Sequence, residues 1–160
     1  MSKSLVAYFS ASGVTAGVAE KLAAAADADL FAICPKEAYS KKDLNWRNPL
    51  SRSSVEMRKR DIRPELDDSV IDLSGYDRIF LGFPIWWYVA PTLINTFLEA
   101  HDFAGKTIVL FATSGGSGFG KTVDGLKPSV DASATMIEGR LFNGDFTPED
   151  YRAFVQAYTE

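Results

Sequence analysis

The chain has 160 residues, of which 46% are hydrophobic and 24% charged, which is the composition of an ordinary globular protein with one sizeable core. Its net charge of −4 argues against general nucleic-acid binding, and no apolar run approaches the roughly 18 residues of a membrane span. A single cysteine excludes an internal disulfide framework, and one cysteine with one histidine disfavours a zinc site. We expect a single domain, residues 1–160, without a secretory signal. The low cysteine content suggests the reducing cytoplasm.

Five β-rich runs alternate with helix-like segments along the chain. The runs are 4–9, 28–33, 78–83, 107–112 and, with a weaker pattern, 135–141. The helix-like segments are 15–26, 91–100, 121–126 and 148–157, with Pro91 and Pro148 in first turns and Thr147 as an N-cap. The first, third and fourth runs are almost continuously apolar, which is typical of strands covered on both faces. The alternation predicts an α/β fold, a doubly wound parallel sheet with helices on both sides.

The segment after the second run is long for a single connection between a strand and a helix. Residues 36–63 hold nine Lys and Arg against four Asp and Glu, so this segment carries +5 and the rest of the chain −9. We expect a short helix over 53–60, with Ser53 or Ser54 as its N-cap and an end set by Pro64. The segment is either a solvated surface excursion or a basic rim that attracts an anionic partner such as a nicotinamide dinucleotide.

The first β-rich run ends in three hydroxyl residues and one glycine, directly before a predicted helix: Ser10, Ser12, Gly13 and Thr15. A helix N-terminus offers unpaired N–H groups and a partial positive charge, so this turn can bind a phosphate. The turn lacks the lysine of a Walker A loop and has one glycine where a dinucleotide fingerprint has three. It therefore suits a terminal monophosphate, unless the hydroxyls only cap the helix and bind no ligand.

Two further loops follow the third and fourth runs, and a parallel sheet brings all three loops to one edge. Three adjacent aromatic residues, Trp86, Trp87 and Tyr88, cannot easily all be buried, so at least one is expected to be exposed or to pack on a flat ligand. Alternatively, one tryptophan fills the core and another lies in a subunit interface. Four glycines within residues 113–120 predict a close approach of backbone to a ligand, whereas Lys121 gives only a superficial likeness to a P-loop.

Together these loops resemble the FMN-binding loops of the flavodoxin-like family. Residues 10–15 resemble its phosphate turn, with Val14 where the family often has Asn; residues 83–91 resemble the loop under the isoalloxazine ring, and 113–120 the loop at its pyrimidine end. The resemblance implies FMN as cofactor and a three-layer sandwich with a five-stranded parallel sheet in the order 2-1-3-4-5. The cofactor-binding residues that it implies are Ser10, Ala11, Ser12, Gly13, Val14, Thr15, Pro84, Ile85, Trp86, Trp87, Tyr88, Thr113, Ser114, Gly115, Gly116, Gly118 and Phe119.

The resemblance also implies electron transfer through the flavin, from NAD(P)H or from a redox partner protein to a small acceptor, with no catalytic side chain required. Electron-shuttling flavodoxins are more acidic than this chain, especially near the flavin ring. This difference favours an NAD(P)H oxidoreductase of the quinone reductase type over an electron carrier, and a homodimer is compatible with both functions. The alternative is a non-enzymatic binding or regulatory domain of the same fold without tight flavin. His101 is expected at a helix end rather than as a base, and Cys34 as a small apolar packing residue.

Overall fold

The computed structural model describes residues 3–11, 13–67, 71–86, 88–114 and 118–158. The strands of this part of the chain are β1 (Ser4–Tyr8), β2 (Asp29–Ala32), β3 (Arg78–Pro84), β4 (Thr107–Thr113) and β5 (Thr135–Leu141). They form one sheet in the order β2-β1-β3-β4-β5, and every neighbouring pair is parallel. The predicted doubly wound sheet and its strand order are confirmed.

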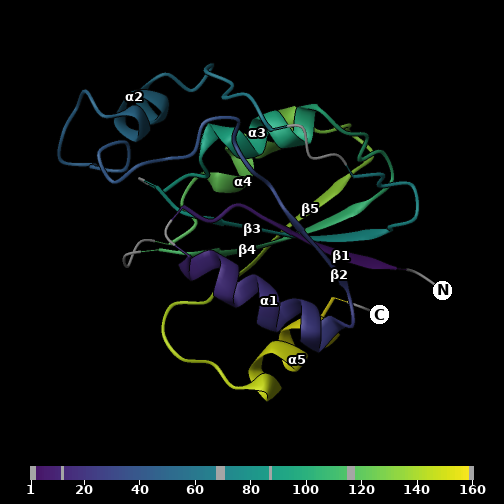
Figure 1. The fold of residues 1–160 in the computed structure, drawn as a ribbon. Helices are drawn as coiled ribbons and strands as arrows, with labels where there is room; N and C mark the ends of the chain where they lie inside the picture. Colours follow the sequence, from purple (N-terminus) through teal and green to yellow (C-terminus); the bar gives the residue numbers. More distant parts are fainter. Residues whose placement is uncertain (1–2, 12, 68–70, 87, 115–117, 159–160) are drawn as a thin grey trace.

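Helices lie on both faces of this sheet and make it the middle of three layers (Figure 1). The helices are α1 (Val14–Ala26), α2 (Arg52–Arg58), α3 (Thr92–Glu99), α4 (Thr122–Leu126), a short 3₁₀ helix η1 (Lys127–Ser129) and α5 (Pro148–Gln156). Helices α1 and α5 cover one face, while α3 and α4 cover the other (Figure 1). Among the described residues, no helix combines the length and the apolar character needed to cross a membrane.

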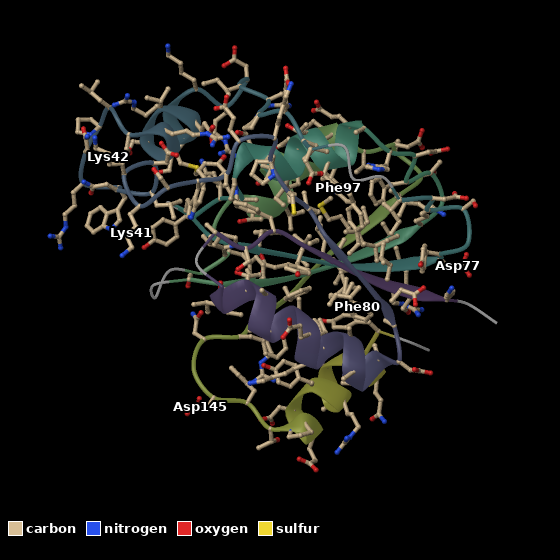
Figure 2. The ribbon with its side chains drawn as sticks, in the orientation of Figure 1. Lys41, Lys42, Asp77, Phe80, Phe97 and Asp145 are labelled. Carbon is tan, nitrogen blue, oxygen red and sulfur yellow. The ribbon has the colours of Figure 1, made fainter. Side chains whose placement is uncertain are left out.

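The core consists of two apolar clusters, one on each side of the sheet, because successive strand residues point to opposite faces. Val6, Phe80 and Val109 occupy aligned positions of β1, β3 and β4 and pack in the cluster with α1 and α5. Their neighbours Ile79 and Ile108 pack in the other cluster, which includes α3. Figure 2 shows Phe80 on the α1 side of the sheet and Phe97, from α3, on the opposite side. Burial on both faces explains the continuously apolar strand sequences.

The sequence also predicts some helix ends correctly. At the start of α5, Thr147 is the N-cap and Pro148 is in the first turn, and the Thr147 hydroxyl and the Asp150 carboxylate form a capping box. The predicted cap of α2 is wrong: the N-cap is Ser51, whose hydroxyl accepts a hydrogen bond from the backbone N–H of Ser54. Ser51 has extended backbone, as an N-cap requires, whereas Ser53 and Ser54 lie buried within the helix, which ends at Arg58.

A smaller correction concerns α3. Pro91 is the N-cap of this helix and Thr92 its first residue, so the proline directly precedes the first turn instead of belonging to it. The remaining α-helices and strands begin and end within two residues of the predicted positions, whereas the 3₁₀ helix η1 was not predicted.

Candidate functional site

The three predicted loops meet at the carboxyl edge of the sheet, because β1, β3 and β4 are adjacent and parallel. The backbone N–H of Phe9 donates to the Gly82 carbonyl (3.0 Å), and that of Ile85 donates to the Thr113 carbonyl (2.8 Å). These bonds continue the strand pairing to the point where each loop begins. Figure 1 shows α1 beginning at this edge, next to the ends of β3 and β4.

The first loop leads into α1 through Gly13, the N-cap, which has a left-handed φ of +93° that suits glycine. No side chain of the described residues caps α1, and its first turn contains no acidic residue. The Ser10 hydroxyl accepts a hydrogen bond from the Gly13 N–H (3.0 Å), which folds the loop back and leaves the hydroxyl hydrogen of Ser10 able to donate. The amides of the first turn and this hydroxyl form a set of donors suited to an anion.

Two threonines join the first loop to the third. The Thr15 and Thr113 hydroxyl oxygens lie 2.8 Å apart, and both side chains are buried, with exposed fractions of 2% and 5%. One of the two hydroxyls donates to the other, so one hydroxyl hydrogen of the pair remains to be donated elsewhere. This pairing across 98 positions of sequence places a polar donor beneath the N-terminus of α1.

The second loop turns sharply between Trp86 and Val89, whose backbone groups form two hydrogen bonds with each other (3.0 and 3.2 Å). Tyr88 occupies this turn with a φ of +66°, which is unusual for a bulky residue, and is 59% exposed. Trp86 is half-buried, and its ring packs edge-on to Phe9 and Tyr39. The prediction that at least one of the three aromatic residues is exposed is confirmed by Tyr88.

Contacts with the third loop fix the strained backbone of Tyr88. The Lys121 N–H donates to the Tyr88 carbonyl (3.1 Å). Gly120, with a φ of +54°, lies so close that a Cβ there would be 2.5 Å from the Tyr88 Cβ and 2.6 Å from its carbonyl oxygen. Glycine is therefore required at position 120 by contact between the two loops. Strained residues held this way by their surroundings are common at functional sites.

The third loop is also joined to the segment after β5. The Ser114 N–H donates to the Asn143 side-chain oxygen (2.8 Å), and the Asn143 amide donates to the Ser114 hydroxyl oxygen (3.0 Å). Together with Val14 and Gly17, these two residues line a cavity of about 260 Å³ beside α1. Asn143 was not predicted as a site residue; its position directly after a strand could have indicated it, since parallel strands end at the same edge.

The predicted site residues thus fall into three groups. Ser10, Gly13, Val14, Thr15, Trp86, Tyr88, Thr113 and Ser114 lie in the three loops or at their ends with the contacts given above, and Ala11, Pro84 and Gly118 lie in the same loops. Ile85 and Phe119 bury their side chains in the core, so at this edge they offer their backbone. Ser12, Trp87, Gly115 and Gly116 lie outside the described residues. The binding role of each residue stays a prediction.

His101 and Cys34 lie outside these loops. The His101 ring follows the end of α3, donates a hydrogen bond from Nδ1 to the Phe97 carbonyl (2.9 Å) and packs on the Phe97 ring, as expected of a helix-end residue. Cys34 is half-buried, and burial, followed by the charge of Asp67, raises the pKa of its thiol. A raised pKa lowers thiolate content, which does not suit a reactive cysteine.

The comparisons with known proteins agree with this architecture. A family model described as flavodoxin matches residues 3–158. The chain belongs to the flavodoxin family. A candidate flavoprotein from Bacteroides eggerthii DSM 20697 is 45% identical to this flavodoxin-family protein, with a TM-score of 0.88 and 98% of each chain covered. Another, from Bacteroides uniformis ATCC 8492, is 43% identical, with a TM-score of 0.87, covering 97% of this chain and 98% of that one.

A more distant structure shows the same fold with a ligand. The flavoprotein from Lactobacillus acidophilus NCFM, in complex with FMN, is 22% identical to this flavodoxin-family protein over the whole of both chains, with a TM-score of 0.72. A search of curated proteins gives no significant match. The family and fold expected from the three loops are therefore confirmed.

Proposed function

We propose that this flavodoxin-family protein binds FMN at the carboxyl edge of its sheet and transfers electrons through it. The observation that carries the proposal is the N-terminus of α1, which no described side chain caps and which lies beside the buried Thr15–Thr113 hydroxyl pair at the edge where Tyr88 is exposed. Membership of the flavodoxin family and the FMN complex of the similarly folded flavoprotein support it.

The donors of the first loop suit the phosphate of FMN. Residues 10–15 contain no charged side chain, so neutral hydroxyls and the amides at the start of α1 would have to balance the phosphate. The Ser10 hydroxyl and the free hydrogen of the threonine pair supply two side-chain donors. A monophosphate needs fewer donors than a pyrophosphate, which agrees with the single glycine of this turn.

Of the two aromatic residues of the second loop that the structure describes, Trp86 and Tyr88, the exposed Tyr88 is the better placed to cover a flat ring. Its side chain is exposed, while its backbone is fixed by Gly120 and Lys121, so little ordering remains to be done on binding. Trp86 supports the loop from below through its packing on Phe9 and Tyr39. When bound, FMN supplies one- and two-electron redox chemistry, and the protein positions it. Electrons come from NAD(P)H or from a redox partner protein.

A visible absorption spectrum and an FMN titration test the cofactor. We expect Thr113→Val to weaken FMN binding about tenfold, since it removes the hydroxyl that pairs with Thr15 and replaces it with a methyl group. The matched control is Thr107→Val, the same substitution at the amino end of the same strand, which should leave the affinity unchanged. A colourless protein that binds no FMN would support the non-enzymatic binding domain instead. Stopped-flow mixing with NADH or NADPH then identifies the electron source.

A further inference from the structure

The basic segment 36–63, called here the basic lobe, projects beyond the carboxyl edge of the sheet. Several of its cations are held by neighbours: Lys36 pairs with Glu65, Arg52 with Glu56, and Arg63 with Glu99. Six others form no ion pair among the described residues: Lys41, Lys42, Arg47, Arg58 and Lys59, which are exposed, and Arg60, which is half-buried. Figure 2 shows Lys41 and Lys42 at the outer end of the lobe, at the opposite end of the molecule from Asp77.

The lobe is attached to the loop that carries Tyr88. At its start, the Tyr39 ring packs edge-on to Trp86, with ring centroids 5.5 Å apart. Near its end, the Arg60 guanidinium donates to the Ala90 carbonyl (2.8 Å), two residues after Tyr88. Both contacts place the lobe next to the proposed flavin site and argue against an excursion without a defined position.

Polar contacts inside the lobe give it a defined shape. The Tyr39 hydroxyl donates to the Glu56 carboxylate (2.5 Å), which also pairs with Arg52 (3.0 Å). The Arg52 guanidinium stacks over the Tyr39 ring, 3.9 Å from its centroid, and donates to the Glu37 carbonyl. Glu56 is 5% exposed, so a cluster of satisfied polar groups joins α2 to the residues that contact Trp86.

Exposed apolar side chains accompany these charges. Among the described residues, the exposed large hydrophobic side chains are Val14, Leu30, Trp46, Leu50 and Tyr88. Trp46 and Leu50 belong to the lobe, with exposed fractions of 64% and 82%, and Val14 and Tyr88 belong to the proposed flavin site. The Arg47 guanidinium lies over the Trp46 ring, 5.1 Å from its centroid. Exposed Trp and Arg next to one another are typical of the residues that dominate protein–protein binding.

The lobe suits a protein better than a nicotinamide dinucleotide. A pocket on the lobe, of about 310 Å³, is lined by three glutamates, Glu37, Glu56 and Glu65, against two cations, Lys36 and Arg52, that already pair with two of them. This lining repels a pyrophosphate. The exposed unpaired cations lie elsewhere, spread along residues 41–59 together with Trp46 and Leu50, and a spread of charge around apolar residues is what a broad protein surface can contact.

We propose that the basic lobe and the exposed rim of the flavin site, Val14 and Tyr88, form the docking surface for an electron-transfer protein whose own surface is acidic around its redox centre. This inference rests on the proposed FMN function, since electrons must pass at that rim. The net charge of +5 on the lobe attracts an acidic partner, while the net charge of −9 on the remaining chain repels it, so the partner approaches from the side of the lobe. Binding is expected to be weak and sensitive to salt, as in transient redox complexes.

The first test measures the local charge with a small anion. The FMN-loaded protein is reduced, and its oxidation by ferricyanide is followed by stopped flow at increasing ionic strength. If the lobe governs the approach, salt slows the reaction, by about tenfold between low and high salt. If the overall negative charge of the FMN-loaded protein governs it, salt accelerates the reaction, and this result overturns the proposal.

The second test uses a protein partner and a matched pair of variants. An acidic plant-type ferredoxin, fluorescently labelled, is titrated with the FMN-loaded protein, and electron transfer from reduced ferredoxin is timed. Lys41→Gln with Lys42→Gln should weaken binding and slow transfer about threefold or more at low salt. Lys3→Glu lowers the net charge equally but lies at the opposite edge, where the Lys3 carbonyl accepts from the Asp77 N–H, and should have little effect.

The outcomes separate the two proposals. If the protein binds no FMN, the proposed function is wrong, and the docking-surface proposal, which depends on it, is wrong too. A protein that binds FMN but prefers a basic cytochrome c over ferredoxin, or responds equally to both sets of variants, overturns the docking surface alone. If Lys41→Gln with Lys42→Gln instead slows reduction by NADPH, the lobe recruits the dinucleotide, and the protein-partner proposal is wrong.

Discussion

Replacing Gly120 with alanine tests how the third loop holds Tyr88. A left-handed φ of +54° costs alanine about 1–2 kcal/mol. The new Cβ would also lie 2.5 Å from the Tyr88 Cβ and 2.6 Å from its carbonyl oxygen, and backbone atoms cannot yield as a flexible side chain does. Relief of this overlap should break the hydrogen bond from Lys121 to Tyr88, worth about 1 kcal/mol. We expect a total loss of about 2–3 kcal/mol in the free energy of unfolding.

The assay is urea unfolding of the flavin-free protein, followed by an FMN titration. Because the overlap displaces Tyr88, FMN affinity should fall about tenfold, which corresponds to about 1.4 kcal/mol. The control is Gly75→Ala, in the turn before β3 and outside the three loops, where a Cβ meets no described atom within 4 Å. If Gly120→Ala and Gly75→Ala have the same stability and the same FMN affinity, the close contact of the two loops does not hold Tyr88, and the reasoning is refuted.

Four further predictions concern the phosphate turn, the last helix and the cysteine. Thr15→Ala should weaken FMN by about 1–3 kcal/mol in titrations, since it removes a buried donor of the phosphate turn. Thr147→Ala should lower the unfolding free energy by about 0.5–2 kcal/mol in urea, because it removes the N-cap of α5. The hydrogen bond from the Thr147 N–H lowers the pKa of Asp150 below 3.8. The stability that Asp150 adds relative to Asn is therefore present above pH 3.8 and is lost as the pH falls through the lower pKa of the folded state. Unfolding curves of Asp150→Asn at several pH values check this. Iodoacetamide should alkylate Cys34 more slowly than a free thiol at neutral pH, since burial raises its pKa, and an equal rate would contradict this.

Patterns local in sequence predicted much of the fold. The continuously apolar runs located β1, β3 and β4, and the helix between each pair of strands predicted a parallel sheet. Thr147 and Pro148 identified the start of α5 because a cap and its first turn lie within four residues. The cap of α2 was harder to predict, since three serines, at positions 51, 53 and 54, lie near it and only backbone conformation selects Ser51.

Contacts between distant residues were not predictable in this way. Gly82 lies within β3, as predicted, but the sequence does not show why glycine stands there: a Cβ would be 2.1 Å from the Phe111 ring of β4. Gly139 lies at an irregularity in the pairing of β4 with β5, where a Cβ would be 2.0 Å from the Leu110 carbonyl oxygen. Both glycines leave space for atoms of a neighbouring strand. The sequence of one strand does not show which atoms of its neighbour will lie close to it.

The alternation of strands and helices in the sequence determined that three loops of hydroxyl, aromatic and glycine residues follow strands of one parallel sheet, and the resemblance to the flavodoxin-like family implied that these strands are adjacent. Only the tertiary structure decided which residues of those loops touch. In the structure Thr15 pairs with Thr113, Tyr88 is exposed and Trp86 is half-buried. The absence of a Cβ at Gly120 makes room for Tyr88. The tertiary structure also placed the basic lobe beside the same edge through Tyr39 and Trp86. These contacts depend on packing between segments far apart in sequence. The periodicity of apolar residues within one segment carries no information about that packing.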